Sequence, residues 1–262
     1  MKPRADAGRG KWCESLRHEP RNCSREHITG ARGGKRGGCH GQHGKTPAGF
    51  RNDRWNWHAS NPEIDWMVER VAAVRDAVGP SVDLAIDMHG RYDIASGIAV
   101  AKAMEPFRLL WLEEPVPPDR IGAYAEIRRQ TGIPIAGGEH EYTRWGFKVL
   151  LDAEGVDVIQ ADPDWTGGLS EMVKICALAS AYGVQVIPHG HSVLPALHVI
   201  AAQSPEVCPL LEYLILHNAR KQWFHTVQYA PAHGMVALPT MPGLGIALDP
   251  ERVHRRTELH WA

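Results

Sequence analysis

Short apolar runs alternate with amphipathic stretches along the chain from about residue 54 onward. Each apolar run ends close to a polar residue. The runs that we predict to be strands are RWNWH (54–58), VDLAID (82–87), LLWLEE (109–114), IPIAGGE (133–139), VDVIQAD (156–162), VQVIPH (184–189) and PLLEYL (209–214). The stretches that we predict to be helices are residues 63–78, 94–104, 120–130, 144–154, 168–182 and 193–203. Near-continuous apolar strands separated by helices are typical of a parallel sheet covered by helices.

The spacing of these βα-like units, about 25 residues each, predicts an α/β fold of the TIM-barrel type. Glycines that follow predicted helices fit the left-handed position of a C-terminal cap. They are Gly79, Gly132, Gly155 and Gly183. A doubly wound open sheet is the alternative, but it usually carries a glycine-rich nucleotide loop after its first strand. The sequence has no such loop, so the barrel is favoured.

Residues 1–53 have a different composition from the rest of the chain. The first 50 residues contain 10 glycines, and residues 1–55 contain 13 Lys and Arg against 5 Asp and Glu, although the whole chain has a formal net charge of −1. A segment with so few aliphatic positions buries too little apolar surface to fold, so we predict a disordered, basic, glycine-rich leader. The stretch GARGGKRGGCHGQHGK (30–45) leaves an RNA-binding tail as the alternative. It has no interleaved aromatic residues, so we expect no nucleic-acid partner.

Cysteine usage and hydropathy exclude several other classes of protein. The five cysteines lack CxxC spacing, which argues against a zinc site, and their odd number argues against a disulfide framework. They are Cys13, Cys23, Cys39, Cys176 and Cys208. No apolar run approaches the ~20 residues of a membrane span, and the basic N-terminus lacks the apolar core of a secretory signal. We therefore expect a cytoplasmic protein without a membrane partner.

One charged or polar residue recurs near the carboxyl end of each predicted strand from the second onward. These residues are Asp87, Glu113, Glu139, Asp162, His189 and Glu212. Their successive separations are 26, 26, 23, 27 and 23 residues, close to one βα unit each. In a parallel barrel the functional residues collect at this end of the strands. We expect the six side chains to face a common centre.

The first three of these residues predict a metal site. Carboxylates that lie together do not all stay ionised without a counter-charge. An oxygen-rich site with three carboxylates suits Mg²⁺, which keeps open positions for water or substrate oxygens. Asp87, Glu113 and Glu139 are therefore the predicted metal ligands. The alternative for any one of these acids is a helix N-cap or a surface charge.

Two histidines are candidates for acid–base chemistry. Asp162 and His189 end neighbouring predicted strands, and a carboxylate beside an imidazole fixes its tautomer and supports its protonated form. His189 is the predicted base; a purely structural His–Asp hydrogen bond is the alternative. Residues two apart on a strand share a face, so we expect His89 to point the same way as Asp87 and to act as an acid. A histidine merely hydrogen-bonded at the rim is the alternative.

The sequence resembles the enolase superfamily, in its mandelate racemase/muconate lactonizing branch, over roughly residues 54–250. The matching motifs are WLEEP, GGEH, QADPDWTGGL, IPHGHS, LLEYL and PGLGIALD. The resemblance implies that Asp87, Glu113 and Glu139 bind Mg²⁺ and that Asp162 and His189 form the base dyad. It also implies that Glu212 hydrogen-bonds the substrate carboxylate.

Two shorter motifs suggest the subfamily. DMHGR (87–91) resembles galactonate dehydratase, and GEH (138–140) resembles rhamnonate dehydratase. Both are acid-sugar dehydratases, so the implied substrate is a small sugar acid, with Arg91 and His140 as substrate-binding residues. The implied reaction is dehydration to a 2-keto-3-deoxy acid through an enediolate. His189 would remove the C2 proton, and His89 would protonate the leaving hydroxide.

The sequence also departs from the family pattern. The N-terminal capping domain and the first barrel strand are missing, so we expect an incomplete (β/α)7β barrel over residues 54–262, preceded by the unrelated leader. An inactive truncated barrel is one alternative, and an epimerase or racemase is another. Asn56 and His58 stand where a Lys-x-Lys base is usual, which argues against two-base racemisation. The family often forms oligomers, so the resemblance is compatible with a homo-oligomer.

Overall fold

The structure is a computed structural model that describes residues 28–29 and 57–257. The chain divides into two compact units. Unit 1 comprises Met1–Gly138 and Lys148–Val158, and unit 2 comprises Glu139–Phe147 and Ile159–Ala262. The predicted leader falls, apart from two residues, outside the described part of the chain. Each unit is described by itself.

Unit 1 contains a small sheet in which three neighbouring strands are parallel and one is antiparallel. Its strands are β1 (Ile28–Thr29), β2 (Ala85–Asp87), β3 (Leu112–Glu113) and β4 (Ile135–Gly137). Strands β2, β3 and β4 are parallel, whereas β1 pairs antiparallel with β2. The register places Asp87 beside Glu113, and Glu113 beside Ala136. The strand order therefore follows the chain from β2 to β4.

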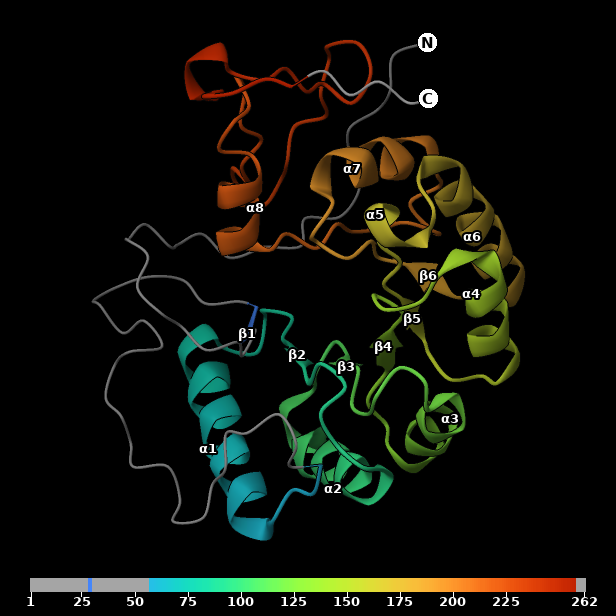
Figure 1. The fold of residues 1–262 in the computed structure, drawn as a ribbon. Helices are drawn as coiled ribbons and strands as arrows, with labels where there is room; N and C mark the ends of the chain where they lie inside the picture. The colour runs from blue at the N-terminus through green and yellow to red at the C-terminus, as the bar shows by residue number, and fades with distance from the viewer. Residues whose placement is uncertain (1–27, 30–56, 258–262) are drawn as a thin grey trace. The chain divides into compact units, whose positions relative to one another are not determined.

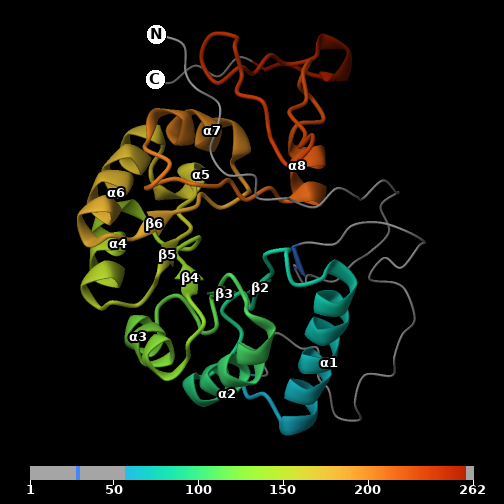
Figure 2. The same ribbon diagram turned by 180° about the vertical axis from the view of Figure 1, so that it is seen from behind.

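The helices of unit 1 are α1 (Asn61–Val78), α2 (Ile94–Met104) and α3 (Ile121–Gln130), and a 3-10 turn, η1 (Glu105–Phe107), follows α2. Helix α1 begins where the Ser60 backbone amide donates to the Glu63 carboxylate at 2.8 Å. It ends at Gly79, whose φ of 76° suits glycine. Helix α2 lies between α1 and α3 (Figures 1 and 2) and packs against both. These three helices agree with the prediction to within a few residues.

Two elements cross the boundary between the units. Helix α4 (Thr143–Asp152) begins in unit 2 and ends in unit 1, and β5 (Val158–Ile159) has one residue in each. In unit 2, β5 continues beside β6 (Gln185–Val186). The Ile187 amide donates to the Ile159 carbonyl at 2.8 Å, and the His189 amide donates to the Ala161 carbonyl at 3.2 Å. The segments that follow β5 and β6 are thus held side by side by backbone hydrogen bonds.

The remaining elements of unit 2 are helical. They are α5 (Pro163–Thr166), α6 (Leu169–Tyr182), α7 (Val193–Ala202), α8 (Ile215–Lys221) and a 3-10 turn, η2 (Pro250–Arg252). Helix α6 packs against α5, α7 and β6 (Figure 1). Its inward face is fully buried and apolar, with Met172, Ile175 and Ala179 at 0% exposure. Parallel strands alternating with helices confirm the predicted α/β class.

Two predicted strands were wrong for the residues that the structure describes. Residues 209–214 form no strand. A single backbone hydrogen bond, from the Glu212 amide to the Pro188 carbonyl at 3.3 Å, connects this stretch to the segment that follows β6. Residues 57 and 58 are also irregular, and 54–56 lie outside the described residues. In the run 209–214, Leu210, Leu211 and Leu214 are partly buried although they have no partner in a sheet. In the described residues no helix is long and apolar enough to cross a bilayer.

Candidate active site

A buried imidazole–carboxylate pair lies at the exits of β5 and β6 in unit 2. His189 Nδ1 is 2.9 Å from Asp162 Oδ2. The Asp162 side chain is completely buried, and that of His189 is 8% exposed. Because Nδ1 of His189 faces Asp162, the other ring nitrogen, Nε2, points away from this carboxylate. The predicted contact between Asp162 and His189 is therefore present in the structure.

His189 contacts a second carboxylate through its other nitrogen. Its Nε2 atom is 3.0 Å from Glu139 Oε2, and the Glu139 side chain is 4% exposed. Burial alone lowers the pKa of His189, but the hydrogen bonds to Asp162 and Glu139 and the charge of Glu212 outweigh it and raise the pKa to about 11. With both carboxylates ionised, the imidazole is held in its protonated form.

Asp162 is placed by its own local structure. It is the N-cap of α5, and its Oδ1 accepts from the Asp164 amide at 2.8 Å. The same oxygen accepts from Ser192 Oγ at 2.6 Å, so the second oxygen is left for His189. The helix-cap alternative is thus true of Asp162, and the same carboxylate also contacts His189. Ser192 was not predicted, although it stands three residues after His189 in IPHGHS.

A second polar group lies next to this pair. Lys221 on α8 donates to Asp164 Oδ2 and to the His191 carbonyl, the latter at 3.2 Å, and its Nζ is 3.4 Å from His191 Nδ1. Burial and the Lys221 charge lower the pKa of His191. Ligand atoms of Asp162, Asp164 and His191 lie within 4.8 Å of one another, but the Lys221 ammonium already occupies their surroundings. This group is therefore a poor cation site.

The Trp165 ring lies close to three histidine rings of unit 2. Its ring centroid lies 5.6 Å from that of His140, 5.8 Å from that of His189 and 5.6 Å from that of His191. Trp165 follows Asp162 by three residues, in α5. Trp165 and Lys221 were not predicted, because neither type of residue indicates a role without knowledge of its neighbours.

Glu212 reaches the same region from the loop before α8. Its Oε2 accepts from the Gly190 amide at 3.1 Å. Asn218 on α8 donates to the Gly190 carbonyl at 2.6 Å and to the Leu214 carbonyl at 3.1 Å, so it ties both sides of this contact together. A Cβ on Gly190 would lie 2.7 Å from the Glu212 carbonyl carbon. Only glycine allows this close approach.

Two of the predicted metal ligands lie in unit 1. Asp87 ends β2 and Glu113 ends β3, and the two residues are paired in the sheet register. In-register residues of neighbouring strands project to the same face, so the two carboxylates leave the sheet together. Trp111 Nε1 donates to Glu113 Oε2 at 3.1 Å, which orients the carboxylate. Glu139, the third predicted ligand, follows β4 by two residues and belongs to unit 2.

The donor chemistry fits the ion that the sequence predicted. Glu113 is 5% exposed and stands beside a second carboxylate, an arrangement that calls for a counter-charge. Carboxylate oxygens are the ligands that Mg²⁺ prefers in proteins. In unit 2, Glu139 Oε2 faces the His189 imidazole. A cation bound to Glu139 would compete with the protonated imidazole for the negative charge of this carboxylate.

His89 lies beyond the end of strand β2. Strand β2 ends at Asp87, and His89 lies in the following turn with a φ of 51°. The Asp87 carboxylate accepts the His89 backbone amide at 2.7 Å. The alternation of strand faces does not extend through this left-handed turn. His89 is exposed.

The two predicted substrate residues have aromatic neighbours. The Arg91 guanidinium lies 5.8 Å from the centre of the Tyr92 ring in unit 1. The His140 ring stands beside Trp165 in unit 2, with its Nδ1 3.5 Å from Glu139 Oε1. Both side chains are partly exposed, as residues that contact a substrate have to be.

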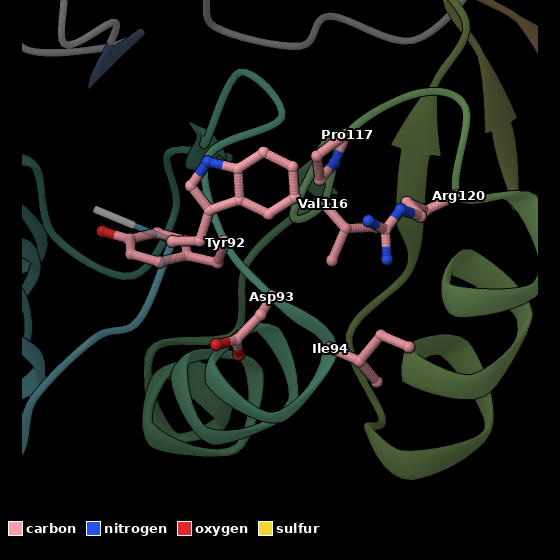
Figure 3. A pocket seen from close by; sticks show the side chains of 7 residues that line it. Tyr92, Asp93, Ile94, Val116, Pro117 and Arg120 are labelled. Carbon is pink, nitrogen blue, oxygen red and sulfur yellow. The ribbon is translucent and has the colours of Figure 1, made fainter. Parts of the chain in front are cut away.

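A small pocket in unit 1 is distinct from these residues (Figure 3). It is lined by Trp57, Tyr92, Asp93, Ile94, Val116, Pro117 and Arg120. Asp93 is also the N-cap of α2, where it accepts from the Ser96 amide at 2.7 Å. No predicted site residue lines the pocket. It is therefore not the candidate active site.

Comparison with known proteins gives consistent matches. Residues 44–253 match the family described as enolase C-terminal domain-like. The chain is 35% identical over 207 residues to D-galactarolactone cycloisomerase of Agrobacterium fabrum, covering 74% of this chain and 55% of that protein. It is 36% identical over 201 residues to L-rhamnonate dehydratase of Saccharopolyspora erythraea, covering 74% and 51%. The chain thus spans about half the length of the curated relatives it matches.

A solved structure agrees with these matches. The mandelate racemase/muconate lactonizing enzyme-like protein from Rubrobacter xylanophilus has a TM-score of 0.69 and 44% sequence identity, covering 76% of this chain and 52% of that one. A racemase from Streptomyces coelicolor, whose structure is described with bound magnesium, has a TM-score of 0.66 and 30% identity over 74% and 52%. These likenesses confirm the superfamily that the sequence motifs indicated.

Proposed function

Because the chain belongs to the enolase C-terminal domain-like family, we propose that it carries the catalytic residues of a Mg²⁺-dependent sugar-acid dehydratase. The proposed reaction converts a sugar acid to a 2-keto-3-deoxy acid. The observation that carries the proposal is the buried His189 imidazole, held at Nδ1 by Asp162 and facing a carboxylate at Nε2. Relatives named L-rhamnonate, D-xylonate and D-galactonate dehydratase support this reaction class.

Asp87, Glu113 and Glu139 would hold the metal. When bound, Mg²⁺ would neutralise the negative charge that develops on the substrate carboxylate as the C2 proton leaves. In unit 1, Trp111 orients the Glu113 carboxylate through its indole N–H. Such orienting contacts are a regular part of metal sites.

His189 would remove the C2 proton through Nε2. Asp162 keeps the proton of the neutral imidazole on Nδ1 and stabilises the imidazolium that forms. The Glu139 carboxylate raises the pKa of His189, and a cation that shared the charge of this carboxylate would weaken that effect.

The second half of the reaction needs an acid for the leaving hydroxide. We assign this role to His89, because its exposed position in the turn after β2 leaves it accessible to substrate. Glu212, oriented by the Gly190 amide, would contact the substrate carboxylate. Arg91 and His140 would contact the rest of the sugar acid, which is the proposed partner molecule.

A cycloisomerase is the second candidate function. A relative with that name shares 35% identity. The two functions would use the same dyad and would differ in the group that leaves. Mass spectrometry of the product separates them, because dehydration releases water whereas cycloisomerisation leaves the mass unchanged.

The proposed function is tested first at the metal site. Calorimetric titration with Mg²⁺ should show one site in the wild-type chain, and Glu113→Gln should remove it. Glu114→Gln is the matched control, because Glu114 is the neighbouring acid and is also buried. Loss of binding in Glu114→Gln with retention in Glu113→Gln would show that the wrong acid was assigned.

The second test is a screen of sugar acids with Mg²⁺ in D₂O. Wild type should exchange the C2 proton of its substrate and release a 2-keto-3-deoxy acid. His89→Asn should still exchange the proton but dehydrate slowly, because only the second step loses its acid. If His89→Asn stops exchange altogether, His89 acts in the first step and the assignment of roles is wrong.

A further inference from the structure

Two cysteines from distant parts of the sequence meet in the interior of unit 2. Cys176 lies in α6, and Cys208 lies in the segment between α7 and α8. Their Sγ atoms are 3.6 Å apart, and the residues are separated by 32 positions. Cys176 is 0% exposed and Cys208 is 3% exposed, and both are free thiols. No sequence motif marks this pair.

We propose that Cys176 and Cys208 form a modification site, in which a low-molecular-weight disulfide of the glutathione type converts the thiol pair into an intramolecular disulfide. A disulfide bond is about 2.05 Å long, so the sulfurs have to approach by about 1.5 Å. Small rotations of the two side chains supply a movement of this size. This inference is independent of the proposed dehydratase activity.

The surroundings of the two sulfurs suggest the order of events. The residues just before Cys208, Ser204 to Glu206, are exposed, whereas Cys176 is flanked in α6 by fully buried Ile175 and Ala179. A local opening of the exposed segment would therefore bring out Cys208 first. In the closed structure the contact with Cys176 and burial raise the pKa of the Cys208 thiol, so the same opening also favours the Cys208 thiolate.

The exchange is balanced without a further reactant. The Cys208 thiolate attacks the small disulfide, which forms a mixed disulfide and releases one small thiolate. The Cys176 thiolate then attacks Sγ of Cys208, which forms the protein disulfide and releases the second small thiolate. Two electrons pass from the protein thiols to the small disulfide, and the two protons that the protein loses protonate the released thiolates.

The new bond would tie α6 to a segment that supports Glu212. The Val186 amide of β6 donates to the Val207 carbonyl at 2.8 Å, so the segment before Cys208 is already attached to the strand on one side. Four residues after Cys208, Glu212 accepts from the Gly190 amide. A disulfide would hold this segment from the α6 side as well. Oxidation should therefore make the neighbourhood of Glu212 more rigid.

The test uses the full chain with Cys13, Cys23 and Cys39 replaced by serine, which leaves only the proposed pair. After incubation of the folded protein with oxidised glutathione, thiols are counted in denaturant and peptides are mapped by mass spectrometry. We expect the count to fall from two thiols to none per chain, with a Cys176–Cys208 cross-linked peptide and no glutathione adduct. Dithiothreitol should restore both thiols.

Two variants test the order in which the cysteines react. In the same background, Cys176→Ala should stop at a glutathione adduct on Cys208, and Cys208→Ala should react more slowly. Comparison of the oxidised and reduced forms of one protein needs no further substitution, and the urea midpoint should be higher in the oxidised form. Thiols that stay free in the folded protein, a link between two chains, or a disulfide that forms only after unfolding would each overturn the proposal.

Discussion

The two units hold their candidate residues in different ways. In unit 1, Asp87 and Glu113 are placed by the pairing of β2 with β3, so the backbone ladder sets their positions. In unit 2, Asp162 is placed by side-chain and cap hydrogen bonds from His189, Ser192 and the Asp164 amide. The backbone hydrogen bonds between β2 and β3 do not depend on most side chains, so they should persist after most substitutions. The buried network of unit 2 depends on each member, because a buried polar group that loses its partner is costly.

Because of this difference, substitutions in the two units should affect different properties of the protein. Replacing a carboxylate in unit 1 should change metal affinity with little effect on folding. Replacing a group in the unit 2 network should affect both the chemistry and the packing around it.

The largest effect should come from the centre of the unit 2 network. His189→Asn should lower turnover and C2-proton exchange by about 10²–10⁴-fold, since it removes the general base. His191→Asn is the matched control, because this histidine lies two residues after His189 but makes no hydrogen bond to Asp162 that is described in the structure. Equal losses in the two variants would mean that the base has been misassigned.

A smaller effect is expected from the residue that orients a metal ligand in unit 1. Trp111→Phe should weaken Mg²⁺ binding by about tenfold, because it keeps the ring but removes the N–H that binds Glu113. Calorimetry gives the affinity. Trp57→Phe is the control, since Trp57 stacks with Arg120 at 5.6 Å and should leave Mg²⁺ affinity unchanged. A shift in both variants would point to a general effect on unit 1.

A pair of glycine substitutions compares the packing of the units. Gly190→Ala in unit 2 should cost about 1–3 kcal/mol of unfolding free energy, because the new Cβ would meet the Glu212 and Leu214 backbone. Gly97→Ala in unit 1 should cost less, since its Cβ meets the flexible end of Ile127 and alanine favours the helix. Urea unfolding measures both. A more damaging Gly97→Ala would reverse the comparison.

The smallest effect concerns the charge beside the dyad. Burial and Lys221 lower the pKa of His191, so the folded state binds fewer protons than the unfolded state as the pH falls below the ordinary histidine pKa. Stability should therefore decline in that range. Lys221→Met should raise the pKa of His191, because it removes the cation but not the burial, and should flatten the decline. NMR titration of the imidazole measures the shift; an unchanged or lower pKa would contradict this account.

Particular residues show how far sequence reasoning reaches. The spacing of 26 residues between Asp87 and Glu113 predicted their pairing, because βα units of constant length return the chain to equivalent positions. Local rules also predicted α1, α2 and α3. His89 marks the limit, since the left-handed turn that separates it from Asp87 depends on the connection to the next element. The cysteine pair marks another, since α6 and the segment after α7 bring its sulfurs together.

The sequence by itself determined which residues stand at the strand ends, and with them the α/β class, the superfamily and the His189–Asp162 pair. These properties follow from periodicity and from motifs whose members lie close together in the chain. Only the tertiary structure decided that Ser192 and the Asp164 amide share one oxygen of Asp162, and that Glu139 holds His189 from the other side. It also decided that Lys221 adjoins His191. Such contacts arise where separate elements pack together, and their distances depend on the fold of the chain between them.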